Sequence, residues 1–337
     1  MPMFNVAVVG ATGAVGGTML RVLEERGFPV TELRPLASAR SEGMELDYLG
    51  RPRAVRRLTE DAFEDIQIAL FSAGANRSRE FAPAAVEAGA VVIDNSSAFR
   101  MDAEVPLVVP EVNEDALQGH SGIVANPNCV AAPLVVALKP IADAVGLERV
   151  VVSSYQAVSG TGQAAVTELV EQTAGLLAGD EPEPAVYPHP IAFNVLPHIG
   201  DFAPDGYTGE EQKVADETRK MLALPELRVS ATCVRVPVLH AHSQAVNIET
   251  VDELTADDAR NLLMAAPGVV LVDEPGASRY PLPREAAGRD DVLVGRIRED
   301  ASHPRGLALW VVSDNLRKGA ATNAVQIAES LVTRGWL

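Results

Sequence analysis

A cysteine at the expected start of a helix is the side chain best suited to covalent chemistry in this sequence. Cys129 follows the turn Asn126-Pro127-Asn128 and precedes an apolar stretch over residues 130–141. Pro133 fits a helix there only within the first turn, which puts Cys129 at the helix N-terminus. The helix dipole favours a thiolate, the form that attacks carbonyl carbon. Cysteine beside an apolar helix is more often a small core residue, but the turn exposes this thiol, and we interpret it as a nucleophile.

A thiol that forms an acyl intermediate needs a proton partner, and two histidines are candidates. His240 and His242 follow a strand predicted over residues 228–239. Their spacing places both on one face if the chain stays extended, so spacing alone does not choose between them. Cys233 lies inside the alternating strand and is predicted to be a core residue.

Two further features point to an anionic substrate. Thr208 and Glu211 have the spacing of a capping box. The helix that follows would carry Glu210 and Lys213 on one face, where a solvent-exposed ion pair is the ordinary alternative. Arg235 is the only charged residue within its strand after residue 228, and it either faces solvent or clamps a carboxylate.

A glycine-rich turn predicts a dinucleotide site. The motif Gly10-Ala11-Thr12-Gly13-Ala14-Val15-Gly16 follows an apolar strand predicted over residues 6–9. Glycine permits close approach of a ligand, and the following helix offers free N–H groups and a positive dipole end to a pyrophosphate. A tight turn without a ligand is the alternative.

The end of the second predicted strand indicates which dinucleotide is bound. An NAD site usually has an acidic residue there, for the ribose 2′-hydroxyl. This chain has Ser38-Ala39-Arg40-Ser41 instead, whereas Glu32 lies at the beginning of the strand. A cation flanked by hydroxyls suits a 2′-phosphate, so NADP is favoured over NAD.

The elements that carry these residues fall into two groups. Short apolar runs alternate with helical periods through the first half, which predicts a doubly wound parallel sheet. Longer, partly alternating strands in the second half predict a mixed or antiparallel sheet. Helices are expected over residues 15–26, 79–88, 163–177, 210–222, 256–264 and 319–332, with an exposed loop over 179–190. We expect a first domain over residues 1–128, completed by a C-terminal helix within 318–337, and a second over 129–317.

Composition narrows the possible partners. The chain has 337 residues and a formal net charge of −18, with no basic run, which argues against nucleic-acid and anionic-membrane binding. No apolar run approaches the ~18 residues needed to span a bilayer. The chain shows no export signal and has only two cysteines, so we expect a cytoplasmic protein. Metal-site spacings are absent, and no metal is expected.

Seven stretches, in order along nearly the whole chain, resemble the aspartate-β-semialdehyde dehydrogenase family. They are Val9-Gly10-Ala11-Thr12-Gly13-Ala14-Val15-Gly16, Ile93-Asp94-Asn95-Ser96-Ser97-Ala98-Phe99-Arg100, Val108-Val109-Pro110-Glu111-Val112-Asn113, Asn126-Pro127-Asn128-Cys129, Ser154-Tyr155-Gln156-Ala157-Val158-Ser159-Gly160, Arg235-Val236-Pro237 with His242-Ser243, and Asp314-Asn315-Leu316-Arg317-Lys318-Gly319.

The resemblance implies a reversible, phosphate-dependent oxidoreductase. L-aspartate 4-semialdehyde, phosphate and NADP⁺ would interconvert with L-aspartyl 4-phosphate and NADPH, on the route to diaminopimelate, lysine, threonine and methionine. It also implies a Rossmann-type NADP-binding domain and an α+β catalytic and dimerisation domain with a mixed sheet. The extended sheet of the second half suggests a homodimer, since symmetric dimers are the default oligomer.

The resemblance also assigns roles to residues. Cys129 would form the thioester, His242 rather than His240 would be the acid/base, and Gln156 would orient the reacting group. Arg235 would hold the substrate carboxylate, with Glu210 near its ammonium. Arg100, Asn128 and Lys213 would bind phosphate. The cofactor would be lined by Gly10, Thr12, Gly13, Ala14, Val15, Ser38, Arg40, Ser41, Ser159, Gly160 and Asn315.

One departure and two alternatives accompany this interpretation. Many family members have glycine before the catalytic histidine, where this chain has Ala241. The nearest alternative is N-acetyl-γ-glutamyl-phosphate reductase, whose acetylated amine would not favour a carboxylate at Glu210. The other is a non-catalytic NADP-binding relative, although such proteins typically lose the nucleophile.

Overall fold

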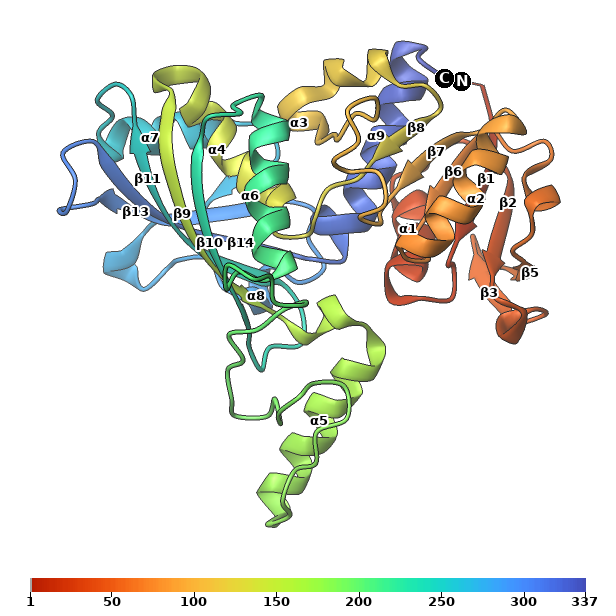
Figure 1. The fold of residues 1–337 in the computed structure, drawn as a ribbon, viewed down its shortest axis with the longest axis horizontal. Helices are drawn as coiled ribbons and strands as arrows, with labels where there is room; N and C mark the ends of the chain where they lie inside the picture. The colour runs from red at the N-terminus through yellow and green to blue at the C-terminus, as the bar shows by residue number, and fades with distance from the viewer. Residues whose placement is uncertain (1) are drawn as a thin grey trace. The chain divides into compact units, whose positions relative to one another are not determined.

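The computed structural model describes residues 2–337, which form two compact units (Figure 1). One unit comprises residues 2–128 and 320–337, and the other comprises Cys129–Gly319. We refer to them as unit 1 and unit 2. None of the helices in the described part of the chain is long and apolar enough to span a membrane.

Unit 1 is built on a parallel six-stranded sheet with the order β5-β2-β1-β6-β7-β8. Its strands are β1 (Phe4–Val9), β2 (Val30–Ala37), β5 (Arg56–Arg57), β6 (Ile68–Phe71), β7 (Val91–Asp94) and β8 (Ile123–Ala125). Successive strands leave β1 first on one side and then on the other. This reversal opens a crevice at the carboxyl ends of β1 and β6, where doubly wound folds bind ligands.

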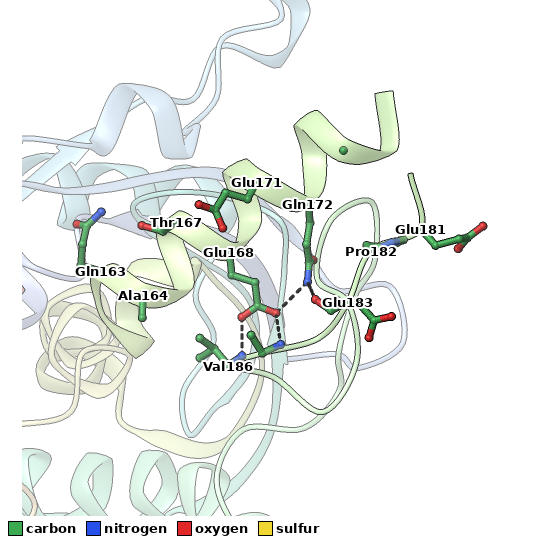
Figure 2. A pocket seen from close by; sticks show the side chains of 12 residues that line it. Gln163, Ala164, Thr167, Glu168, Glu171, Gln172, Glu181, Pro182, Glu183 and Val186 are labelled. Carbon is green, nitrogen blue, oxygen red and sulfur yellow. Dashed lines mark hydrogen bonds between the residues drawn. The ribbon is translucent and has the colours of Figure 1, made fainter. Parts of the chain in front are cut away.

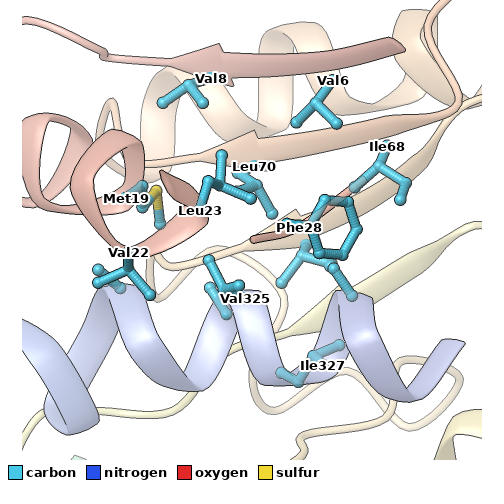
Figure 3. Packing of buried hydrophobic residues seen from close by; sticks show 14 of the residues in the cluster. Val6, Val8, Met19, Val22, Leu23, Phe28, Ile68, Leu70, Val325 and Ile327 are labelled. Atoms are coloured by element: carbon cyan, nitrogen blue, oxygen red, sulfur yellow. The ribbon is translucent and has the colours of Figure 1, made fainter. Parts of the chain in front are cut away.

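Helices cover both faces of this sheet. On one face α1 (Ala14–Glu25) and α9 (Thr322–Arg334) pack together, and Met19, Leu23 and Val325 meet Val8 and Leu70 of the strands (Figure 3). On the other face α2 (Ala75–Glu87) buries Phe81 and Ala85 against the alternate strand residues. The smaller elements are β3 (Glu45–Tyr48), β4 (Arg51–Ala54) and α3 (Pro110–Asn113).

Unit 2 contains a mixed six-stranded sheet with the order β10-β9-β11-β14-β13-β12. The strands are β9 (Leu147–Gln156), β10 (Arg228–Arg235), β11 (His242–Thr250), β12 (Val269–Leu271), β13 (Val292–Glu299) and β14 (Gly306–Ser313). The outer pairs β9–β10 and β12–β13 are parallel, whereas the central pairs are antiparallel. The predicted mixed sheet is confirmed.

One face of the mixed sheet is covered by α4 (Ala131–Val145), α6 (Gly209–Leu222) and α7 (Ala256–Ala265). Helix α5 (Gln163–Ala178) instead extends away from the sheet, and the segment after it folds back along it (Figure 1). The short α8 (Pro283–Ala286) contacts β14. On the opposite face α8 packs Ala286 against Leu293 and Val312, and the same face carries Tyr155, which is 36% exposed.

Several predicted boundaries are wrong for local reasons. The strand predicted over 228–239 ends at Arg235, because its only partner in the sheet, β9, ends opposite it at Gln156. Helix α2 begins at Ala75 rather than at residue 79, directly after Gly74 in a positive-φ conformation. Helix α9 begins at Thr322, because residues 317–321 form a π-helix before it. The hairpin β3–β4 is short and charged, and its pattern did not predict strands.

Candidate active site

Cys129 and His242 lie in contact in unit 2. Cys129 comes two residues before α4, with Pro133 in the first turn of that helix as expected. Its Sγ lies 3.4 Å from Nε2 of His242, the first residue of β11. The thiol is partly accessible, whereas His242 is only 1% exposed. The structure therefore places a reachable sulfur beside an enclosed imidazole.

His240 and His242 do not share a face. The chain does not stay extended between them, because Ala241 has a φ of 69° in the left-handed region. His240 is exposed, and His242 points into the interior. This turn, which spacing could not reveal, is what distinguishes the two histidines.

The imidazole of His242 is fixed from its other side. The backbone N–H of Ala157 donates to Nδ1 at 3.0 Å. A backbone N–H can only donate, so Nδ1 accepts and the neutral ring carries its proton on Nε2, facing the sulfur. Complete burial lowers the pKa of His242 well below its ordinary value, and the charge of Arg235 lowers it further. At neutral pH the ring is therefore neutral.

The register of three strands sets the candidate side chains in a row. Arg235 pairs with Gln156 across β10 and β9. Ser243 pairs with Tyr155 across β11 and β9, which puts His242 opposite Gln156. These three side chains, each at the end of its strand, are buried on the helix-covered face of the sheet. Arg235 is 5% exposed, Gln156 1% and His242 1%.

Arg235 does not face solvent. One Nη atom donates to the Ala157 carbonyl at 2.8 Å, and the guanidinium lies 6.0 Å from the ring centre of Tyr187. A Cβ on Gly160 would lie 3.0 Å from that Nη and 3.3 Å from the His242 ring. The absence of a side chain at Gly160 therefore leaves the space that these two groups occupy.

Helix α6 supplies the polar groups on the far side of Gln156. The predicted capping box is confirmed, since Thr208 and Glu211 bond each other's backbone N–H groups. Gln156 Nε2 lies 3.4 Å from Glu210 Oε1, and Lys213 Nζ lies 3.9 Å from Glu210 Oε2. Glu210 is buried while Lys213 is 43% exposed at its side chain, so the pair is not the fully solvated one given as the alternative.

Cys233 is a core residue, as predicted. It is 1% exposed, and burial raises the pKa of its thiol to about 12. Its backbone N–H donates to Glu211 Oε1 at 2.9 Å. Such a thiol is unreactive at neutral pH.

The expected phosphate ligands are divided between the two units. Arg100 and Asn128 are buried in unit 1, and Lys213 lies in unit 2. Arg100 is oriented by two backbone carbonyls, because Nε donates to Asn126 and Nη2 to Asn95, each at 2.9 Å.

The glycine-rich turn of unit 1 is built for close backbone approach. A Cβ on Gly10 would lie 2.4 Å from the Ser72 carbonyl oxygen, and one on Gly16 would lie 2.2 Å from the Gly10 oxygen. Beside the turn is a cavity of 690 Å³, lined by residues after β1, β2 and β6. The lining includes Gly10, Thr12, Gly13, Ser38, Arg40, Arg57, Ser72 and Arg77. Its size and its glycine and arginine lining fit a dinucleotide.

Glu32 is occupied elsewhere, whereas the end of β2 faces this cavity. Glu32 Oε1 accepts from Nε and Nη2 of Arg34 and forms an ion pair with Arg56. Ser38 and Arg40 line the cavity, and Ser41 lies 3.5 Å from Thr12 through their hydroxyl oxygens. Arg57, paired in register with Ala37, adds a cation that the sequence pattern did not single out.

The remaining expected cofactor residues belong to unit 2. Ser159 and Gly160 lie in the 3₁₀ turn Val158–Thr161, which follows β9. Asn315 follows β14, and its Oδ1 accepts from the Ser159 hydroxyl at 3.1 Å and from the Ala241 N–H at 3.0 Å. The three residues that form these hydrogen bonds are all buried: Ser159, Ala241 and Asn315.

The loop after α5 contributes Tyr187, a residue that the sequence did not single out. Glu168 accepts from the N–H groups of Ala185 and Val186 at 3.1 and 2.7 Å, and Gln172 donates to the Glu183 carbonyl at 2.9 Å (Figure 2). These bonds hold the segment before Tyr187, whose ring covers Arg235. The only available signal was an aromatic residue in a Pro- and acid-rich loop.

Gly319 is a second residue without a predicted role. A Cβ there would lie 3.0 Å from Cβ of Cys129 and 3.1 Å from its carbonyl oxygen. The π-helix Arg317–Ala321 therefore approaches the candidate nucleophile only because position 319 lacks a side chain.

Comparisons with known proteins cover nearly the whole chain. The family model described as "Semialdehyde dehydrogenase, NAD binding domain" matches residues 5–120, and "Semialdehyde dehydrogenase, dimerisation domain" matches residues 138–318. Aspartate-semialdehyde dehydrogenase of Aquifex aeolicus is 54% identical over 98% of this chain and 99% of its own length. That of Bacillus subtilis is 52% identical over 97% of each chain.

Solved structures agree with the sequence comparisons. The crystal structure of aspartate semialdehyde dehydrogenase II from Vibrio cholerae complexed with ASA has a TM-score of 0.96 and 50% identity, covering 99% of both chains. A probable aspartate-semialdehyde dehydrogenase from Pseudomonas aeruginosa has a TM-score of 0.92 and 33% identity, covering 98% of this chain and 99% of that chain.

Proposed function

The chain belongs to the aspartate-semialdehyde dehydrogenase family, and from this membership we propose that it interconverts L-aspartyl 4-phosphate and L-aspartate 4-semialdehyde through a thioester on Cys129. The observation that carries the proposal is the contact between Cys129 Sγ and Nε2 of a buried, neutral His242. Acyl reduction through a thioester splits one difficult step into two easier ones. The reaction serves amino-acid biosynthesis, on the route to lysine, threonine and methionine.

Cys129 and His242 carry the covalent steps in this proposal. The thiolate attacks the acyl carbon, the bond to the phosphate oxygen breaks, and a thioester forms. The thioester is then reduced by a hydride, which a nicotinamide cofactor would supply when bound. His242 then shares its Nε2 proton with the hemithioacetal oxygen and recovers it as the C–S bond breaks, which releases the aldehyde and regenerates the thiolate.

The row of strand ends holds the rest of the substrate. Arg235 receives the α-carboxylate, because its buried guanidinium keeps donors beyond the bond to Ala157 and because a planar fork matches a carboxylate. Glu210 attracts the ammonium, and Gln156, within reach of Glu210, orients the carbonyl oxygen beside Cys129. Arg100, Asn128 and Lys213 receive the phosphoryl group.

NADP is the proposed cofactor in preference to NAD. The residues present fit it: Gly10, Thr12, Gly13, Ala14 and Val15 form the turn and helix start that receive a pyrophosphate, and Arg40, Ser38 and Ser41 offer a cation with hydroxyls to a 2′-phosphate. Arg57 adds a second cation, while Glu32 is held by Arg34. The family resemblance also assigns cofactor contacts to Ser159, Gly160 and Asn315, which belong to unit 2.

The proposal also assigns a role to each unit and an oligomeric state to the protein. Unit 1 is the cofactor domain, and unit 2 is the catalytic and dimerisation domain of a homodimer. The dimerisation-domain match and the 36% exposure of Tyr155 on the mixed sheet support a self-associating surface. Since the chemistry requires a reduced Cys129, we assign the enzyme to the cytoplasm.

The test is the phosphate-dependent formation of reduced cofactor from L-aspartate 4-semialdehyde, measured with NADP⁺ and with NAD⁺. We expect turnover only with phosphate present and a higher kcat/KM with NADP⁺. Cys129→Ala should abolish turnover and keep NADP binding, whereas Cys233→Ala, at the buried thiol, serves as the matched control. Activity that survives in Cys129→Ala would rule out the thioester.

The same assay separates the two alternatives. An N-acetyl-γ-glutamyl-phosphate reductase would prefer N-acetyl-L-glutamate 5-semialdehyde, and a non-catalytic relative would turn over neither aldehyde. Glu210 argues against the first, because a buried carboxylate beside the substrate amine suits an ammonium rather than an acetamide.

A further inference from the structure

Ala241 has a backbone conformation that alanine rarely adopts. Its φ is 69°, in the left-handed region where a Cβ crowds the following carbonyl. The residue is 1% exposed and directly precedes His242. A non-glycine residue stays in this conformation only when surrounding contacts hold it there.

Asn315 supplies the contact that holds Ala241. The Ala241 N–H donates to Asn315 Oδ1 at 3.0 Å, and the Ser159 hydroxyl donates to the same oxygen at 3.1 Å. Because a backbone N–H cannot accept, this bond fixes which end of the amide faces Ala241. The backbone before Asn315 is itself anchored, since Asp314 accepts from Leu316 and Gly288 N–H groups at 2.8 and 2.7 Å.

The Nδ2 end of the Asn315 amide is a hydrogen-bond donor that has no acceptor within the described residues. Asn315 is 2% exposed, and its Nδ2 is buried without a hydrogen-bond partner among residues 2–337. A buried donor left unsatisfied is unfavourable, so such groups usually have a ligand or another partner.

We propose that Asn315 is a positioning residue for His242: its Oδ1 holds Ala241 in the left-handed conformation that turns His242 toward Cys129, and its Nδ2 is the donor that it offers to the bound cofactor. One amide thereby connects cofactor binding to the placement of the histidine. The proposal rests on the proposed function for its cofactor part only, because the contact with Ala241 exists in the chain itself.

Thiol alkylation tests the positioning part without substrate or cofactor. The Nε2–H of His242 stabilises the Cys129 thiolate, and Cys233 is buried with a pKa of about 12, so iodoacetamide reports on Cys129. Asn315→Ala should slow alkylation at pH 7 about tenfold, as expected for a thiolate that loses one hydrogen bond. Asn261→Ala, at an exposed position on α7, is the matched control and should alkylate like the wild-type chain.

Ala241→Gly provides the rescue. Glycine adopts a positive φ without a steric cost, so it does not need the bond from Asn315 to remain there. The double variant Asn315→Ala with Ala241→Gly should recover alkylation to within about threefold of wild type, since the strain is removed. Asn315→Ala should also bind NADP more weakly than wild type, because it lacks the Nδ2 donor. The double variant should bind NADP as weakly as Asn315→Ala in a fluorescence titration, because glycine at position 241 does not replace that donor.

Each outcome decides the proposal. Wild-type alkylation in Asn315→Ala would overturn it, and so would a double variant that stays as slow as the single one. If Asn315→Ala does not fold, Asn315→Ser replaces it, because a serine hydroxyl is too short to reach the Ala241 N–H. Failure of the proposed function would appear separately, as a wild-type chain that alkylates at Cys129 but turns over no aldehyde.

Discussion

At the residue scale, Gly160 shows how tightly the candidate site is packed. An added methyl group would press on an Arg235 Nη atom at 3.0 Å and on the His242 ring at 3.3 Å. Both contacts are shorter than comfortable van der Waals packing, so one of the two groups must move.

We predict that Gly160→Ala lowers kcat/KM for the aldehyde about tenfold, because the added Cβ displaces a catalytic group by less than the ~1 Å that costs about a hundredfold. Gly276→Ala is the matched control, since position 276 is exposed and its Cβ would meet nothing within 4 Å. Steady-state kinetics of the two variants measure the difference. Equal kcat/KM values would show that Gly160 does not constrain the site.

His242 gives the protein a pH dependence of stability. Its pKa is lowered in the folded chain by burial and by Arg235, whereas the unfolded chain binds a proton near the ordinary value of about 6.5. Below that pH the unfolded state holds more protons than the folded state. Protonation therefore favours unfolding as the pH falls.

We predict that the free energy of unfolding falls by up to about 1.4 kcal/mol per pH unit below pH 6.5 because of this one group. His242→Gln should lack that part of the slope while keeping the contributions of the other five histidines. Urea unfolding at pH 7.5, 6.5 and 5.5 checks this. Identical slopes in the two proteins would contradict a buried neutral imidazole.

The roles of individual residues could be predicted from the sequence where they depend on neighbours in the chain. Cys129 before an apolar helix and Thr208 with Glu211 follow helix-start chemistry, which depends on neighbours in the chain. The roles of Ala241 and Tyr187 could not be predicted. Ala241 is held in its left-handed conformation by Asn315, 74 residues away, and Tyr187 lies in a loop while its partner Arg235 lies on β10.

At the element scale, the row formed by β9, β10 and β11 depends on strand register. Alternation in the sequence predicted the strands and their buried face, since period-two patterns are local. It did not predict that Arg235, Gln156 and His242 finish at the same level, because register arises from pairing between distant segments.

The arm formed by α5 and the loop after it is another element whose order comes from specific side chains. Glu168 is 6% exposed and accepts two backbone N–H bonds from the loop, together with one from Gln172. The loop itself is rich in proline and acidic residues, which lack intrinsic order.

We predict that Glu168→Gln increases the rate of proteolysis within residues 179–190 about tenfold, because an amide presents only one acceptor oxygen to the two N–H groups. It should also raise the KM for the aldehyde, since Tyr187 loses its support over Arg235. Glu171→Gln, at an exposed position on the same helix, is the control (Figure 2). A loop that stays equally resistant in both variants would refute the role of Glu168.

At the scale of the whole molecule, the net charge of −18 contrasts with the anionic ligands proposed for it. Attraction from the whole surface is unfavourable for an anion, so capture must be local. Arg100 and Arg235 are buried, and Arg40, Arg57 and Arg77 line one cavity. The surface charge and the candidate site therefore have opposite signs.

We predict that Tyr155→Arg converts the proposed dimer into a monomer, because it puts a charge on the face of the mixed sheet opposite α4, α6 and α7. The ring of Tyr155 lies 5.6 Å from that of Trp310 at a tilt of 39°, and Trp310 lines a cavity of 450 Å³. Met264→Arg on α7, which covers the opposite face, should leave the mass unchanged. Light scattering with size-exclusion chromatography measures both, and a Tyr155→Arg dimer would place the interface elsewhere.

The position of α9 has a consequence for synthesis of the chain. Its residues Val325, Ile327 and Leu331 complete the core beside β1, yet about 190 residues separate this helix from the rest of unit 1. At typical translation rates of about 5–20 residues per second, the first 128 residues wait about 10–40 seconds for their last helix. During that interval the ribosome presents an apolar sheet face, which makes the nascent chain a natural client for a chaperone.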